Sequence, residues 1–103
     1  MSKDTCQTGR CLRIVERLCQ HALDGQSNKE LAAALKTTPA NISRDIALLA
    51  DLGWADALPN GRYVVTHQPL SYFRLYKLHL EDVSNRADQF DRRVDARARQ
   101  LAD

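Results

Sequence analysis

The segment from Pro39 to Arg44 holds the side chains best suited to recognising another molecule. Asn41 carries a side-chain amide, which offers a donor and an acceptor and can pair with the edge of an adenine. Arg44 carries a guanidinium, which can form two parallel hydrogen bonds with guanine or bind a phosphate. Local roles stay open: Asn41 can bond to nearby backbone, and Arg44 can pair with Asp45 or Asp51.

A second group of residues could hold a phosphate backbone. They lie at the start of a predicted helix, in the turn after it and in a predicted hairpin: Ser27, Asn28, Lys29, Lys36, Thr37, Thr38 and Arg62. Helix N-termini favour anions, and lysine and arginine supply positive charge, although Lys29 and Lys36 are equally compatible with ordinary surface lysines. The predicted DNA-contacting set combines this group with Pro39, Ala40, Asn41, Ser43 and Arg44.

Enzymatic and metal chemistry find little support in the sequence. The three histidines are scattered over different segments, and there is no glycine-rich phosphate loop. Cys6, Cys11 and Cys19 match neither a CxxC pair nor a usual zinc spacing. We therefore expect no enzyme, no cofactor and no metal site, with Cys11 and Cys19 packing as small hydrophobic residues on the first helix.

The composition is that of a small globular protein. The chain has 103 residues, 44% of them hydrophobic and 27% charged, which leaves room for one compact core and an appendage. No apolar run is long enough to cross a bilayer, and residues 1–4 lack the layout of a signal peptide, so we expect a cytoplasmic protein. The net charge of +2 allows an anionic partner without requiring one.

Sparse glycine and proline residues divide the N-terminal part of the chain into short helices. Apolar residues at helical spacing predict a first helix over residues 8–23, and Gly25 interrupts the pattern. Ser27 and Glu30 have the spacing of a capping box, in which a hydroxyl accepts a hydrogen bond from a free N–H of the first turn. This spacing predicts a second helix over residues 28–35.

A third helix is predicted over residues 39–52, after a tight turn. Thr38 can cap its free N–H groups, and Pro39, which has no N–H, fits the first helical turn. Gly53 supplies a left-handed residue at the end. The expected buried face consists of Ile42, Ile46 and Leu49, with Leu48 and Leu52 on a neighbouring stripe.

The next segment changes from helical to alternating spacing and predicts a β-hairpin, or wing, over residues 54–66. Asn60 and Gly61 stand between two short runs, the second of which is rich in β-branched and aromatic residues. Two short helices joined by a tight turn and followed by a hairpin are typical of a winged helix-turn-helix, whose second helix enters the DNA major groove. We therefore predict a mainly α fold with a small β-hairpin, in which residues 39–52 form the recognition helix.

The last third of the chain predicts one long helix. Neither glycine nor proline follows Pro69, and the apolar residues are spaced alternately by three and four, as in a coiled coil. The seam, which Arg97 interrupts, consists of Phe73, Tyr76, Leu80, Val83, Ala87, Phe90, Val94 and Leu101. In a parallel pair Arg86 would face Asp91 of the other copy, but one such pair does not decide the orientation.

These patterns predict a DNA-binding domain over residues 1–68 and a dimerisation helix over residues 69–103, forming a homodimer. For the first half of the helix an alternative stays open, since Phe73, Tyr76 and Leu80 could fold back onto the first helix of the same chain. The second half is too far from that core, and we expect its apolar residues to need a partner chain.

Several segments together resemble the DNA-binding domain of IclR-type transcriptional regulators. They are Leu12-Arg13-Ile14-Val15-Glu16-Arg17-Leu18, Lys29-Glu30-Leu31-Ala32-Ala33-Ala34-Leu35, Asn41-Ile42-Ser43-Arg44-Asp45-Ile46-Ala47-Leu48-Leu49, Leu52-Gly53-Trp54 and Gly61-Arg62-Tyr63. The likeness spans residues 11–68, and it implies base recognition by residues 39–52 and backbone contact by the hairpin. Family members carry an effector-binding domain after the hairpin, whereas this chain has only the heptad helix, so a small-molecule effector is not expected.

The sequence thus predicts a sequence-specific DNA-binding transcriptional regulator whose partners are double-stranded DNA and a second copy of the chain, with no membrane partner. The alternative is a winged-helix module or accessory factor that contacts another protein and does not bind DNA sequence-specifically. The acidic residues Asp45 and Asp51 on the third helix, together with the modest net charge, favour that alternative.

Overall fold

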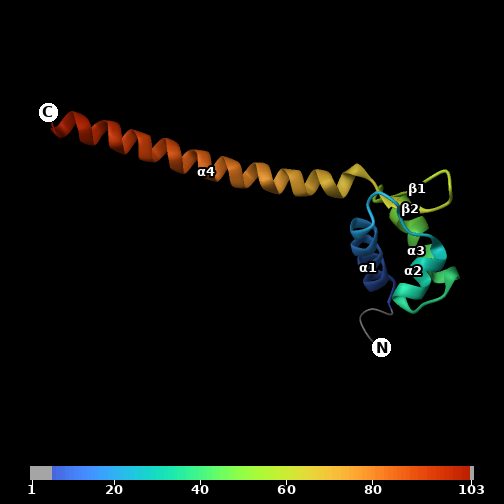
Figure 1. Cartoon of the computed structure of the whole chain (residues 1–103). Helices are drawn as coiled ribbons and strands as arrows, with labels where there is room; N and C mark the ends of the chain where they lie inside the picture. The colour runs from blue at the N-terminus through green and yellow to red at the C-terminus, as the bar shows by residue number, and fades with distance from the viewer. Residues whose placement is uncertain (1–5, 103) are drawn as a thin grey trace. The chain divides into compact units, whose positions relative to one another are not determined.

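The protein is described by a computed structural model that covers residues 6–102. Residues 1–4, on which the signal-peptide expectation rests, lie outside this range. The chain falls into two compact units, the first reaching to Leu70 and the second beginning at Ser71, whereas the sequence placed the boundary between residues 68 and 69. The described residues form helices and one two-stranded antiparallel sheet, as labelled in Figure 1.

Helix α1 spans Gln7–Gln20 and is shorter than predicted at its C-terminal end. Cys6 precedes it, and the Sγ atom of Cys6 accepts a hydrogen bond from the N–H of Gly9 at 3.4 Å. His21 leaves the helical conformation, with φ −121° and ψ 47°. The predicted extension to Leu23 is therefore wrong, and Leu23 is 94% exposed.

Helix α2 spans Asn28–Leu35, as predicted. The Oγ atom of Ser27 accepts a hydrogen bond from the N–H of Glu30 at 3.1 Å, which confirms the predicted cap. Lys36 then adopts a left-handed conformation with φ 57°, and this ends the helix. A left-handed residue other than glycine is uncommon. The direction of the turn into the next helix therefore depends on the backbone conformation of Lys36.

Helix α3 spans Pro39–Asp51, one residue shorter than predicted. The Oγ1 atom of Thr38 accepts a hydrogen bond from the N–H of Asn41 at 3.2 Å, and Pro39 occupies the first turn, as expected. Gly53 adopts φ 82° just after the helix, which confirms the predicted left-handed stop.

The hairpin consists of β1 (Ala55–Ala57) and β2 (Tyr63–Val65), with Ala55 paired to Val65 and Ala57 to Tyr63. It is tied to the loop between α1 and α2, because Gln26 and Tyr63 exchange two backbone hydrogen bonds of 3.0 and 2.8 Å. Gly25 makes this approach possible: its φ is 73°, and a Cβ atom there would lie 2.5 Å from the carbonyl oxygen of Tyr63.

One apolar core holds the first unit together. Four of its side chains are fully buried, namely Ile14, Leu18, Leu31 and Ile42. Around them lie Cys11, Ala32, Ile46, Leu49 and Ala55, so the predicted buried face of α3 is confirmed. At roughly 25 cal/mol per Å² of buried apolar area, a cluster of this kind is the main source of folding free energy.

One sequence-based expectation about packing is wrong. Cys19 is exposed, because the buried face of α1 follows Cys11, Ile14 and Leu18 at spacings of three and four, and Cys19 lies one residue beyond that face. Leu48 and Leu52, which the sequence placed on a neighbouring stripe of α3, are 40% and 59% exposed.

Asp45 is the largest departure from the sequence analysis, since it is fully buried instead of lying on the surface. Its carboxylate receives hydrogen bonds from the Nε and Nη2 atoms of Arg10 at 2.6 and 3.1 Å. Arg10 itself is 12% exposed at the side chain. This pair joins α1 to α3, and it overturns the alternative in which Arg44 pairs with Asp45.

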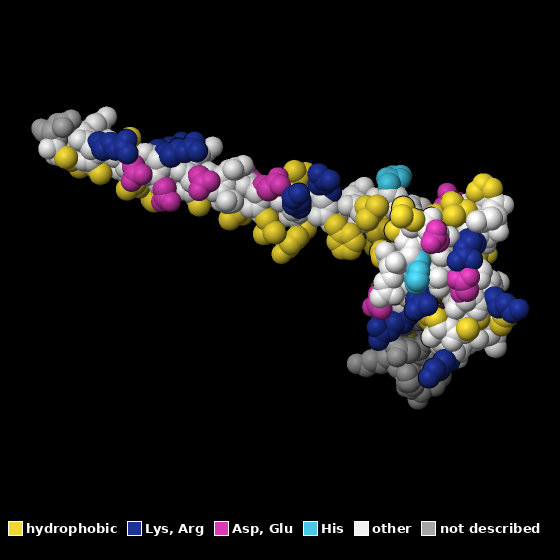
Figure 2. All heavy atoms as spheres, in the orientation of Figure 1, with side chains coloured by type: hydrophobic (Ala, Val, Ile, Leu, Met, Phe, Trp, Pro, Cys, Tyr) yellow, Lys and Arg dark blue, Asp and Glu magenta, His cyan; other side chains and the backbone are white. Residues whose placement is uncertain are grey.

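Helix α4 spans His67–Ala102 and contains 36 residues. It begins before Pro69, which is tolerated because the N–H groups of a first turn have no acceptor within the helix. In the second unit, hydrophobic side chains follow one side of α4, as Figure 2 shows. The large seam residues Phe73, Tyr76, Leu80, Val83, Phe90, Val94 and Leu101 are 50% to 70% exposed. Among the described residues, no helix has the length and apolar character needed to cross a membrane.

Candidate nucleic-acid interface

The outward face of α3 carries mainly short side chains. Ala40, Ser43, Arg44 and Ala47 are all exposed along it, while Ile42 on the opposite side is fully buried in the core. The spacing of three and four residues places the exposed set on one face of the helix. Arg44 is therefore a long cationic side chain among small neighbours in the N-terminal turns of α3, whose backbone could come close to another surface there. The exposed Leu48 and Asp51 lie further along the helix.

Arg44 is connected to Asn41 and Thr37 by a chain of hydrogen bonds. The Nη2 atom of Arg44 donates to the Oδ1 atom of Asn41 at 2.7 Å. The Nδ2 atom of Asn41 donates in turn to the Oγ1 atom of Thr37 at 2.9 Å. The local hydrogen bonding that the sequence left open for Asn41 is thus present, with side chains rather than backbone as the partners.

Asn28 and Ser43, both predicted to contact DNA, are bonded to each other. The Nδ2 atom of Asn28 donates to the Oγ atom of Ser43 at 2.9 Å and lies 3.2 Å from the carbonyl oxygen of Pro39. These bonds hold the first turn of α2 beside the first turns of α3. The two helix starts that sequence analysis singled out therefore lie together on one surface.

Two lysines flank this surface. Lys29 in the first turn of α2 and Lys36 in the turn before α3 are both exposed. In the part of the chain that the structure describes, neither forms an ion pair with an acidic side chain. With Arg44, they place three cations that no carboxylate neutralises along α2, the turn and α3.

Arg62, the predicted hairpin contact, is engaged within the protein itself. Its Nη1 and Nη2 atoms donate to the two carboxylate oxygens of Glu30 at 2.7 and 3.0 Å. It also donates to the carbonyl oxygens of Asp24 and Gly25 at 2.9 and 3.1 Å. The hydrogen bonds between Arg62 and Glu30 hold the pKa of the Glu30 carboxyl below its ordinary value and raise the pKa of Arg62. Arg62 thus fixes the hairpin to α2, and a phosphate contact by Arg62 stays a prediction.

Sequence reasoning missed two features of this surface. Ala47 belongs to the exposed face, and its spacing of three and four from Arg44 and Ser43 could have shown this. The Arg10–Asp45 pair that supports α3 from behind had no comparable signal, because its members are 35 residues apart.

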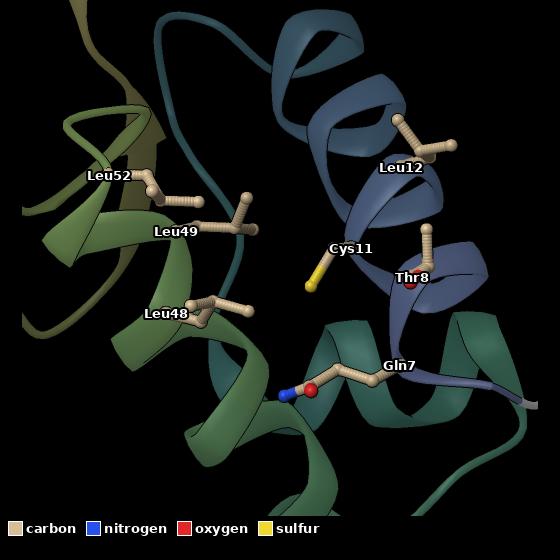
Figure 3. A pocket seen from close by; sticks show the side chains of 7 residues that line it. All are labelled: Gln7, Thr8, Cys11, Leu12, Leu48, Leu49 and Leu52. Carbon is tan, nitrogen blue, oxygen red and sulfur yellow. The ribbon is translucent and has the colours of Figure 1, made fainter.

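A separate groove of about 220 Å³ lies between α1 and α3, and Figure 3 shows its side chains. It is lined by Gln7, Thr8, Cys11, Leu12, Leu48, Leu49 and Leu52. Small-molecule sites are usually larger and combine apolar walls with several convergent polar groups, whereas this groove has only the side chains of Gln7 and Thr8. Within residues 6–102, no cluster of histidine, cysteine and acidic side chains is suited to hold a metal ion.

Comparison with known proteins gives no match among protein families, curated proteins or solved structures. The resemblance to IclR-type regulators therefore rests on the quoted residues alone and stays a prediction.

Proposed function

We propose that the chain is a dimeric transcriptional regulator of the winged helix-turn-helix class, which binds double-stranded DNA sequence-specifically through α3. The observation that carries this proposal is the exposed face of α3, on which Arg44 stands among Ala40, Ser43 and Ala47. A major groove about 12 Å wide admits a helix most deeply when its outward side chains are short. Arg44 is then the side chain long enough to reach a base edge.

The residues around α3 also fit a DNA molecule whose major groove is occupied by α3. Lys29 and Lys36 lie at the two ends of α2, where they would face the phosphates that border a groove occupied by α3. The first turn of α2, held beside α3 by Asn28 and Ser43, would direct its N–H groups to the same backbone. The hairpin, fixed to α2 by Arg62 and Glu30, would lie along the flanking strand.

The exposed seam of α4 supports the proposed dimerisation. Phe90 and Leu101 are 66% and 70% exposed. A second helix that covered such side chains would remove apolar surface from water and so stabilise the paired state. Two copies would present two α3 helices to one DNA molecule, and half-sites would be expected about one helical turn, or 34 Å, apart. The α4 seam is therefore proposed as the homodimer interface.

The test is selection of the full-length protein against random duplex DNA, with binding of the selected site measured across a salt series. We expect a short, two-fold symmetric site to be enriched. Arg44→Ala should weaken binding to that site by about 5- to 150-fold, the value of one bidentate base contact. Arg13→Ala is the matched control, because it removes the same charge from an exposed ion pair on α1. No enrichment, or equal effects of the two substitutions, would overturn the proposal.

The alternative of a protein-contact module loses part of its support. It relied on two acidic residues on the surface of α3, and Asp45 is buried against Arg10. Asp51 stays exposed, but a single acidic residue carries little information about a partner. Retention of dimerisation without any DNA binding would be the result that favours this alternative.

A further inference from the structure

The hydrogen-bond chain on α3 assigns different roles to Arg44 and Asn41, and this assignment rests on the proposed DNA-binding function. Thr37, Asn41 and Arg44 are spaced by four and three residues, so they lie along one side of α3 and the turn before it. Asn41 is the middle member, bonded to Thr37 at 2.9 Å and to Arg44 at 2.7 Å. Arg44 is the outermost and the most exposed.

Asn41 is poorly placed to read a base. Pairing of an asparagine with adenine needs its amide oxygen and one amide N–H at the same time. The oxygen of Asn41 already accepts from Arg44, and one of its two N–H groups already donates to Thr37. These two bonds fix the orientation of the amide, so an adenine could be paired only through the second N–H and the second lone pair in that orientation.

Arg44 is in the opposite situation. A guanidinium has five N–H donors, and the bond to Asn41 uses one of them. The remaining donors can still form the two parallel hydrogen bonds that recognise the O6 and N7 atoms of guanine. The bond to Asn41 also restricts a flexible side chain, which lowers the conformational entropy lost on binding.

We propose that Arg44 reads a guanine in the DNA site and that Asn41 is a positioning residue, which orients the guanidinium and is itself held by Thr37. Asn41 therefore affects the base preference at the base pair that Arg44 reads, and it contacts no base pair itself. The preferred DNA contains a guanine at the position where α3 enters the groove, once in each half-site.

The experiment compares base preferences, position by position, for full-length wild type and substituted proteins selected against random duplex DNA. Arg44→Ala should abolish the guanine preference at one position. Asn41→Ala should reduce it at that same position by about 2- to 10-fold, the value of one hydrogen bond, and Thr37→Val should have a smaller effect there. Lys36→Ala is the control, because loss of a phosphate contact weakens all sequences alike. Thermal unfolding checks that each variant is folded.

Asn41→Asp separates the two roles most sharply. A carboxylate still accepts the hydrogen bond from Arg44, so the guanine preference should be retained even where overall affinity falls through repulsion from phosphates. A carboxylate has no N–H for the N7 atom of adenine, so an adenine-reading Asn41 would lose its preference. The assignment would be overturned if Asn41 variants weakened a preference for adenine at a different position. It would also be overturned if Arg44→Ala weakened binding to all sequences alike. Absence of any sequence preference in the wild type would instead overturn the proposed function itself.

Discussion

The two units of the chain use their apolar residues in opposite ways. In the first unit, Ile14 and Leu18 of α1 and Ile42 of α3 are fully buried within one chain. In the second unit, Phe73, Phe90 and Leu101 of α4 are about two-thirds exposed. A short helix that packs against its neighbours gains its stability from the same chain, whereas an amphipathic helix of 36 residues leaves its seam to be covered by something else.

A substitution should therefore have different consequences in the two units. In the first unit, a change in the core or its buried ion pair alters the free energy of unfolding of a single chain. In α4, a change in the seam should alter the proposed association between chains, and its effect should therefore depend on protein concentration. Four sets of substitutions test this distinction, in order of decreasing expected effect.

Phe90→Ala in the seam should have the largest effect. Two aromatic rings would be lost from the dimer, and at about 1.5–3 kcal/mol for each buried side chain the dimer Kd should rise by more than about 100-fold. Sedimentation of the full-length protein over a range of concentrations measures this. Asn85→Ala, on the opposite side of α4, is the control and should leave the Kd unchanged. A wild type that stays monomeric would contradict the seam as an interface and favour fold-back within one chain.

Arg10→Gln should be the most damaging change to the first unit. It leaves the fully buried carboxylate of Asp45 without its charged partner, and breaking a buried pair in this way costs about 3–5 kcal/mol. Urea denaturation of the full-length protein measures the loss. The double variant Arg10→Gln with Asp45→Asn replaces the charged pair by two amides and should recover a large part of it. No recovery in the double variant would show that Arg10 stabilises the fold by packing alone.

That buried pair also shows why the sequence predicted local structure better than side-chain contacts. The bounds of α2, the caps at Ser27 and Thr38 and the stop at Gly53 follow from residues close together in the chain, and the structure confirms them. The Arg10–Asp45 pair joins residues 35 positions apart. Helical periodicity says which face of α3 is buried, but not that a carboxylate on that face meets an arginine from α1.

The candidate site shows the same limit. Sequence reasoning assigned Asn41 and Arg44 to base reading and Thr37 to phosphate contact, and the structure places the three side chains next to one another. It did not predict that Asn41 would be bonded on both sides, or that Arg62 would be engaged by Glu30. Residue type and spacing identify which groups are near a site, whereas the partners of each group depend on the tertiary structure.

Two glycines offer an intermediate test within the first unit. Gly25 and Gly61 both have positive φ, at 73° and 84°. A Cβ atom at Gly25 would lie 2.5 Å from the carbonyl oxygen of Tyr63, whereas a Cβ atom at Gly61 would meet nothing within 4 Å. Gly61→Ala should cost about 1 kcal/mol from backbone strain, and Gly25→Ala about 1–3 kcal/mol more from the clash with the hairpin. Equal midpoints of urea denaturation for the two variants would contradict this attachment of the hairpin to the α1–α2 loop.

The smallest effect is expected for Glu30→Gln, and it depends on pH. Hydrogen bonds from Arg62 hold the pKa of the Glu30 carboxyl below its ordinary value of 4.5. Because the folded-state pKa is the lower one, the ion pair stabilises the fold fully above pH 4.5 and stops doing so as the pH falls through the folded-state pKa. The difference in unfolding free energy between wild type and Glu30→Gln should therefore be constant near neutral pH and shrink in acid.

Arg62→Gln should show the same acid-dependent difference, since it removes the other member of the pair. The effect stays small because both side chains are partly exposed, at 42% for Glu30 and 30% for Arg62. Urea denaturation of all three proteins between neutral and acidic pH measures it. If the difference did not shrink in acid, Arg62 would hold the hairpin mainly through the carbonyl oxygens of Asp24 and Gly25, which do not titrate. The anchoring of the hairpin would then be independent of Glu30, and the guanidinium could leave Glu30 for a phosphate at little cost to the fold.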